Sequence, residues 1–86
     1  MSIPYYMYMK NDYNKVCEKI RQKIKLERNK RNLSQQDLSL RAELDKNTVW
    51  KIETGKASPT VKTLAKLAIA LEMDFVELMD ISKVEI

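Results

Sequence analysis

Residues 33–55 decide the fold of this chain, and they read LSQQDLSLRAELDKNTVWKIETG. Ser34 and Asp37 have the spacing of a capping box, in which each side chain bonds a backbone amide at the start of a helix. Leu38 and Ala42 follow at i,i+4 spacing and predict one inward face on a helix that ends one residue before Ala42. Because this helix is short, tertiary packing must stabilise it.

A second helix is predicted from Lys46 to Thr54, with Asp45 as its N-cap. Val49 and Ile52 lie three residues apart and should face the core. Gly55 should end the helix, because a positive φ costs glycine little. Two helices joined by a short turn form a helix-turn-helix pattern. A plain helical hairpin would explain the apolar positions but not the polar outer face of the second helix.

Three more helices are expected around this pair. Val16, Ile20 and Ile24 recur every four residues and predict a helix over about 15–31 that ends near Asn32. The fourth helix should be capped by Thr60, or by Ser58 with Pro59 as its first residue, and its inner stripe comprises Val61, Leu64, Leu67, Ala68 and Leu71. A short fifth helix should begin with a capping box of Asp74 and Glu77 and bury Phe75, Leu78 and Met79. The fold class is therefore all-α, with five helices.

Composition excludes several kinds of function. The 86 residues include one Gly and two Pro, too few for an all-β fold rich in tight turns. With no His and a single Cys, the chain lacks the usual zinc ligands and any His-dependent catalytic group. We therefore expect no metal, no cofactor and no enzymatic activity. No apolar run reaches the roughly 18–20 residues that span a bilayer, and no signal-peptide pattern opens the sequence, so a cytoplasmic protein is expected.

Charge is distributed unevenly around a net value of +4. Residues 10–32 hold nine basic and three acidic side chains, whereas residues 72–86 hold one basic and five acidic ones. This asymmetry indicates one end that faces a polyanion and another that is turned away from it. A solvated helix face would produce the same pattern.

The motif resembles the phage-repressor-like (Xre-type) helix-turn-helix family over about residues 20–78. The matching segments are LSQQDL at 33–38, TVWKIETGK at 48–56, PTVKTL at 59–64 and LAIAL at 67–71. The resemblance implies a five-helix, lambda-repressor-like domain over residues 15–80. It also implies a regulator of transcription that binds double-stranded DNA at a palindromic operator as a symmetric homodimer, of the restriction-modification controller or small repressor type.

The resemblance also assigns roles to individual residues, since the start of the second motif helix (46–54 here) reads bases in the major groove. The implied base-contacting residues are Asp45, Lys46, Asn47, Trp50 and Lys51. The implied phosphate-contacting residues are Ser34, Gln35, Lys56, Ser58 and Lys62, and Arg28 with Glu53 is implied to form a structural pair. Plainer interpretations remain open: solvated surface lysines, an unpartnered polar residue at Asn47, or a Trp50 ring folded against Lys46 or the base of its helix.

Two positions depart from the family pattern. Glu43 stands at a turn position that is often Gly, where a positive φ costs a non-Gly residue about 1 kcal/mol. Ser39 stands where the family commonly has Ala; Ser is still small enough for close helix approach, and its hydroxyl can return to a helix carbonyl.

The two ends of the chain allow several interpretations. Residues 1–14 are rich in Tyr and Met and can be a flexible arm, a strand added to a partner, or a cover for the core. The candidate dimer surface comprises Val76, Met79, Ile81 and Val84, extending into the tail over 81–86, which can alternatively pack on its own domain. Two other functions also fit the sequence: an antitoxin that binds a toxin and represses its own operon, and a protein-interaction module that no longer reads DNA.

Overall fold

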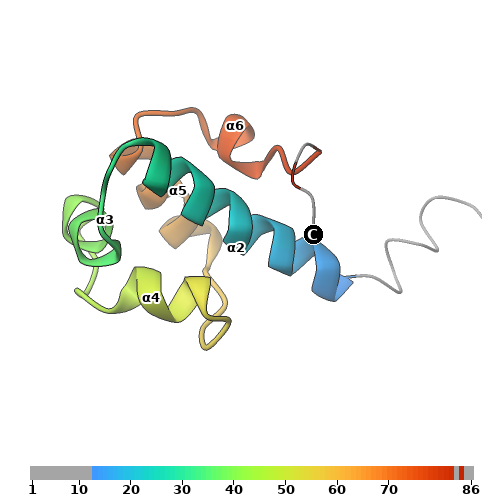
Figure 1. Cartoon of the computed structure of the whole chain (residues 1–86), viewed down its shortest axis with the longest axis horizontal. Helices are drawn as coiled ribbons and strands as arrows, with labels where there is room; N and C mark the ends of the chain where they lie inside the picture. Colours follow the sequence, from blue (N-terminus) through green and yellow to red (C-terminus); the bar gives the residue numbers. More distant parts are fainter. Residues whose placement is uncertain (1–12, 83, 85–86) are drawn as a thin grey trace, which may run out of the picture.

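The computed structural model describes residues 13–82 and residue 84, and this part of the chain is helical without strands. Its elements are α2 (Tyr13–Lys30), α3 (Gln35–Arg41), α4 (Thr48–Glu53), α5 (Val61–Ala70) and α6 (Phe75–Met79). In Figure 1 the long helix α2 lies between α4 on one side and α6 on the other, and both of them pack against it. The all-α, five-helix prediction is confirmed, with the first helix two residues longer at its start than expected.

The core lies where the five helices meet. Each helix contributes at least one fully buried apolar side chain, and the largest are Ile24, Leu38, Val49, Ile52, Leu67, Leu71 and Leu78. Burial of one such side chain contributes about 1.5–3 kcal/mol. The two helices of the helix-turn-helix motif, α3 and α4, pack on each other. In addition, α3 packs on α5 and α4 packs on α2, so the core fixes the angle between the two motif helices.

The predicted capping box at the start of α3 is present. The Ser34 hydroxyl accepts a hydrogen bond from the Asp37 amide at 2.9 Å, and the Asp37 carboxylate accepts one from the Ser34 amide at 3.1 Å. The hydrogen bond from the Ser34 amide holds the pKa of the Asp37 carboxyl below its ordinary value. At α5, Thr60 rather than Ser58 is the cap, because its hydroxyl accepts from the Thr63 amide at 3.1 Å.

Four of the helices end in the same Schellman motif, with one residue at positive φ after the cap. That residue is Asn32 after α2, Glu43 after α3, Gly55 after α4 and Glu72 after α5. At α3, for example, the Leu44 amide donates to the Ser39 carbonyl at 2.8 Å and the Glu43 amide donates to Leu40 at 3.0 Å. Glu43 therefore adopts a positive φ of 59°, the conformation that costs a residue other than glycine about 1 kcal/mol.

The start of α4 differs from the prediction. The helix begins at Thr48, its N-cap is Asn47, and Asp45 does not cap it through its side chain. Residues 45–47 instead form a turn in which the Thr48 amide donates to the Asp45 carbonyl at 3.0 Å. A cap at Asp45 is unnecessary because the Val49 amide finds an acceptor on α3.

Three further predictions at α5 and α6 are wrong. Val61 is 71% exposed because it starts α5 one turn before the stripe reaches the core at Leu64. Phe75 is 38% exposed, since it is the first residue of a five-residue helix that buries only Leu78 fully. Asp74 occupies the N-cap position of α6 but makes no capping hydrogen bond with its side chain.

Candidate nucleic-acid interface

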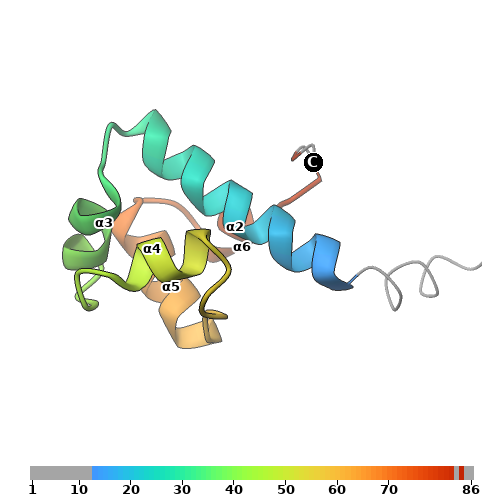
Figure 2. The ribbon, with the colours of Figure 1, turned by 60° about the horizontal axis from the view of Figure 1, so that its bottom comes forward.

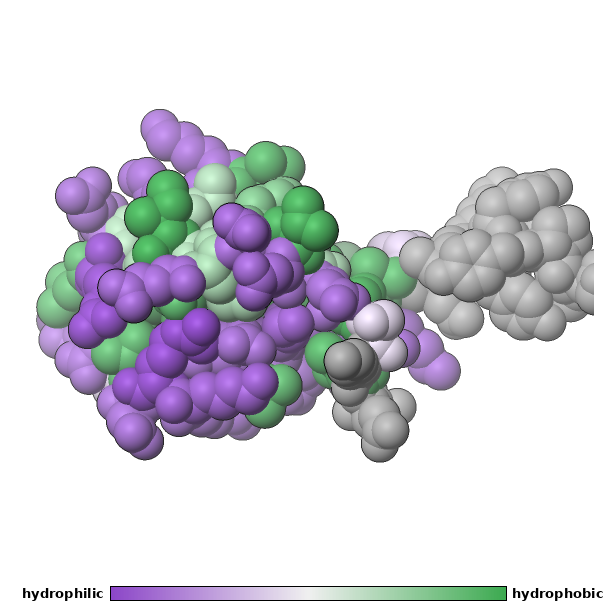
Figure 3. Space-filling model, turned by 90° about the horizontal axis from the view of Figure 1, so that it is seen from above, coloured by the Kyte–Doolittle hydropathy of each residue, from purple (hydrophilic) through white to green (hydrophobic). Residues whose placement is uncertain are grey.

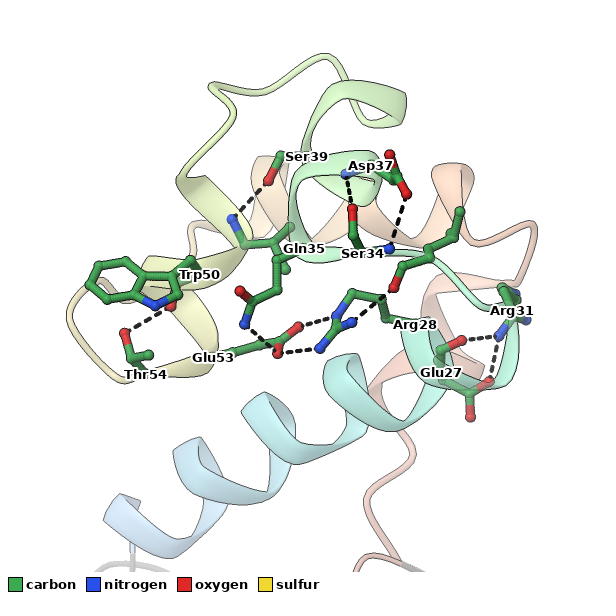
Figure 4. Close-up of polar contacts among 12 residues, drawn as sticks. Glu27, Arg28, Arg31, Ser34, Gln35, Asp37, Ser39, Trp50, Glu53 and Thr54 are labelled. Carbon is green, nitrogen blue, oxygen red and sulfur yellow. Dashed lines mark hydrogen bonds and ion pairs between the residues drawn. The ribbon is translucent and has the colours of Figure 1, made fainter.

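A carboxylate at the end of α4 connects three elements of the fold (Figure 4). Glu53 accepts from Arg28 twice, at 2.7 Å from Nε and 2.8 Å from Nη2, and from Gln35 Nε2 at 3.1 Å. The remaining Arg28 nitrogen, Nη1, donates to the Leu33 carbonyl at 2.8 Å. We call Arg28, Glu53 and Gln35 the Glu53 network. It joins α2, the first residue of α3 and the last residue of α4.

The pairing predicted for Arg28 and Glu53 is thus present, and it is buried. Their side chains are 10% and 3% exposed. Hydrogen bonds to Glu53 raise the pKa of the Arg28 guanidinium above its ordinary value. Desolvation offsets much of the attraction within a buried pair, but removing one partner leaves an uncompensated charge. The network therefore acts mainly by fixing where α4 lies.

A second contact fixes the other end of α4. The hydroxyl of Ser39, a fully buried residue in the middle of α3, accepts from the Val49 amide at 3.0 Å. The hydroxyl thus acts as an acceptor for the next helix, whereas the bond suggested by the sequence used it as a donor to a carbonyl of its own helix. Ser39 and Glu53 together hold the first and last turns of α4.

The base-contact candidates lie on the outside of the molecule. Asp45, Lys46, Asn47, Trp50 and Lys51 are all exposed. Asp45, Lys46 and Asn47 belong to the turn before α4, and Trp50 and Lys51 lie on the helix itself. Turning the lower side of the molecule forward brings α4 to the front with no described segment over it (Figure 2).

The Trp50 ring is 42% exposed and contacts a lysine after the helix. The Lys56 Nζ atom lies 5.7 Å from the ring centroid, a cation–π distance. The partner is therefore Lys56 rather than Lys46. This contact places the Lys56 ammonium beside α4.

The phosphate-contact candidates divide into two groups. Ser34 and Gln35 lie at the start of α3, and Gln35 is half-buried because its amide belongs to the Glu53 network. Lys56, Ser58 and Lys62 lie after α4 and are exposed. Within residues 13–82 neither lysine forms an ion pair, so both charges are open to an external anion.

Three of the acidic residues lie away from α4. Glu72, Asp74 and Glu77 belong to α6 and the turn before it, on the opposite side of α2 from α4 (Figure 1). An anionic ligand that approached α4 would thus avoid them. Within the described residues no group of three or more His, Cys, Asp or Glu side chains is placed to hold a metal ion. Nor does any described helix combine the length and apolarity of a membrane span.

The candidate dimer residues are exposed to different degrees. Val76 is 78% exposed, whereas Met79, Ile81 and Val84 are half-buried and Met79 packs against the core. Figure 3 views the molecule from the α6 side and shows hydrophobic side chains among hydrophilic ones on this face. The first twelve residues of the predicted arm and residues 83, 85 and 86 of the tail lie outside the described residues, and Tyr13 and Asn14 belong to α2.

Sequence reasoning missed one residue beside this surface. Arg21 of α2 lies next to Gly55, at the end of α4. The signal for it was its spacing of seven residues from Arg28, which places both arginines on one face of a helix.

Comparison with protein-family models matches residues 24–78 to the helix-turn-helix model. The match runs from the core residue Ile24 to the core residue Leu78 and includes the Glu53 network, Ser39 and the whole of α4. Searches of curated proteins and of solved structures gave no match.

Proposed function

Because the chain belongs to the Xre-type, lambda-repressor-like helix-turn-helix family of DNA-binding domains, we propose that it is a sequence-specific regulator of transcription. It binds double-stranded DNA with α4 as its recognition helix in the major groove. One observation carries this proposal: Ser39 and Glu53 anchor α4 from the core side and leave its polar side unoccupied.

The exposed residues of α4 and its preceding turn have the chemistry to read base edges. Asn47 can bond adenine through two atoms of its amide, and Lys46 and Lys51 can donate to the acceptors of guanine. Trp50 offers an apolar face to a thymine methyl group or to the edge of a sugar. Asp45, in the same turn, can accept from the amino group of cytosine.

Backbone contacts come from both sides of this helix. Ser34 and Gln35 present the start of α3, where free amides attract a phosphate. Lys56, Ser58 and Lys62 reach the backbone from the segment after α4. For each phosphate that a cation neutralises, the base-10 logarithm of the binding constant should fall by about 0.9 when the salt concentration rises tenfold.

The regulator acts as a symmetric dimer. One domain contacts few base pairs, and a two-fold dimer on half-sites about one helical turn apart supplies the missing specificity. Val76 is the exposed apolar residue around which the dimer forms. The protein needs neither cofactor nor catalytic activity, so it controls transcription by occupying a palindromic operator, as a restriction-modification controller or small repressor does.

Selection of bound sequences from random DNA tests the proposal. We expect enriched palindromic half-sites. Lys51→Ala combined with Asn47→Ala should then relax base preference, whereas Lys62→Ala should lower affinity equally for all sequences. An equal and uniform loss in both variants would mean that the reading face is misassigned, and a pool without enrichment would remove the function.

A protein partner is a second candidate, favoured by apolar side chains outside the interface. Leu40 and Ile69 are 57% and 77% exposed. An antitoxin would use such residues to bind its toxin while it represses its own operon. If the chain binds a protein with an affinity that does not depend on salt, and does not discriminate among DNA sequences, it is a pure protein-interaction module instead.

A further inference from the structure

Arg21 is a cation that the interface described above does not use. It precedes Arg28 by seven residues, about two helical turns, and both side chains point from α2 toward α4. Their environments differ. Glu53 neutralises Arg28, whereas Arg21 has no hydrogen bond or ion pair within residues 13–82.

The Arg21 guanidinium lies at the C-terminal end of α4. A Cβ atom placed on Gly55 would be 3.7 Å from both Cζ and Nε of Arg21 and 3.9 Å from Nη2. Arg21 also lines a hollow of about 120 Å³ between α2, the segment after α4 and α5. The hollow is lined by Cys17, Ile20, Arg21, Ser58, Pro59 and Leu64.

Two other polar groups share this end of α4. Lys56 follows Gly55 directly, with its ammonium held over the Trp50 ring. Ser58 borders the same hollow as Arg21, and its hydroxyl makes no hydrogen bond within the described residues. Glu53, three residues before Lys56, is already occupied by Arg28 and Gln35. The cluster therefore carries two positive charges, and neither forms an ion pair within residues 13–82.

We propose that Arg21, together with Lys56 and Ser58, binds a phosphate of the DNA backbone at the end of the recognition helix. This inference rests on the proposed function, and it adds a residue of α2 to the proposed DNA interface. A guanidinium presents two parallel N–H groups that fit the two non-bridging oxygens of a backbone phosphate, and the Ser58 hydroxyl can donate to one of the same oxygens. In this arrangement α2 holds DNA directly through Arg21 and indirectly through Arg28, which positions α4.

The salt dependence of binding tests the proposal with a mixed-sequence duplex of about 20 base pairs, because phosphate contacts do not need an operator. The variant is Arg21→Gln, and Lys19→Gln is the matched control. Both remove one positive charge from α2. Lys19 lies two residues, about 200°, away from Arg21 on the helix. Lys19 shares a helix face with Lys23. The Lys23 ammonium donates at 2.9 Å to the carbonyl of Asp80, the residue that follows α6.

Arg21→Gln should reduce the magnitude of the salt slope by about 0.9, so the wild type should lose about 3.5-fold more affinity than this variant between 50 and 200 mM salt. Lys19→Gln should leave the slope unchanged, and Arg21→Lys should retain it because the charge remains. Equal slopes for Arg21→Gln and Lys19→Gln would overturn the assignment of Arg21 while leaving the proposed function intact.

Two further outcomes separate the alternatives. A lower urea midpoint for Arg21→Gln with an unchanged salt slope would make Arg21 a support for the end of α4, which overturns the proposal. A wild-type protein that neither binds the duplex nor enriches any sequence from random DNA would overturn the proposed function and this inference with it.

Discussion

Replacing Ser39 by Ala tests whether the position of α4 depends on a single hydroxyl. Both partners of this hydrogen bond, Ser39 and Val49, are completely buried. Val49 is the second residue of α4, so its amide has no acceptor within the helix. The Ser39 carbonyl, which accepts from Leu44, is unchanged by the substitution. Ser39→Ala therefore removes one acceptor and leaves one buried donor without a partner.

The expected loss follows from that orphaned donor. A buried amide without a partner costs about 1–3 kcal/mol, and the higher helix propensity of Ala within α3 offsets up to about 0.5 kcal/mol of this. We expect the free energy of unfolding to fall by about 1–2 kcal/mol. In a domain of this size each kcal/mol lowers Tm by about 4–8 °C.

Urea unfolding measures the effect, and the single tryptophan of the chain, Trp50, reports it by fluorescence from α4 itself. Ser58→Ala is the control, since this exposed hydroxyl has no partner in the described part of the chain and its loss should change stability by less than about 0.5 kcal/mol. If Ser39→Ala is as stable as Ser58→Ala, the Ser39 hydroxyl does not hold α4 and the reasoning fails.

Three other predictions follow from the same contacts. Glu53→Ala leaves the Arg28 charge buried and unpaired, so unfolding experiments should show a loss of about 3–5 kcal/mol and DNA titrations a parallel loss of affinity; an intact fold with unchanged binding would contradict this. Glu43→Gly should raise the urea midpoint, because glycine adopts a φ of 59° without the roughly 1 kcal/mol penalty; an unchanged or lower midpoint would show that the turn is unstrained. The pKa of the Asp37 carboxyl is lowered by the Ser34 amide, and that of Glu27, which burial alone would raise, is lowered by hydrogen bonds from Arg31 and Lys30. Lowered values stabilise the fold above the unfolded pKa of about 4. Stability should therefore fall as pH drops through the folded values, and less steeply in Asp37→Asn.

Local chemistry explains which features the sequence predicted well. A capping box involves residues three apart, so the pattern at Ser34 and Asp37 contains the whole interaction. The positive φ at Glu43 agrees with the family resemblance, which puts a turn position that is often Gly there. Core residues such as Leu38 and Ile52 are predictable because helical periodicity requires only neighbouring residues.

Contacts between distant residues explain the rest. Asp45 had the right chemistry for a cap, but Ser39, ten residues before Val49, supplies the acceptor and the helix starts later. Gln35 was expected to contact a phosphate, but its amide also donates to Glu53, which is 18 residues away and which only the structure identifies as a partner. Arg21 reaches Gly55 across the fold. In each case side-chain direction decides the partner.

The length of α4 gives these distant contacts their importance. A helix of six residues is far below the roughly 12–15 residues that an isolated helix needs for stability in water. Its core side chains, Val49 and Ile52, attach it to the domain but do not by themselves fix its rotation or its position along its axis. Ser39 fixes the first turn, and the Arg28–Glu53 pair fixes the last. A one-ångström displacement would move every exposed side chain relative to base edges, so the specificity of the proposed interface depends on buried polar contacts that never touch DNA.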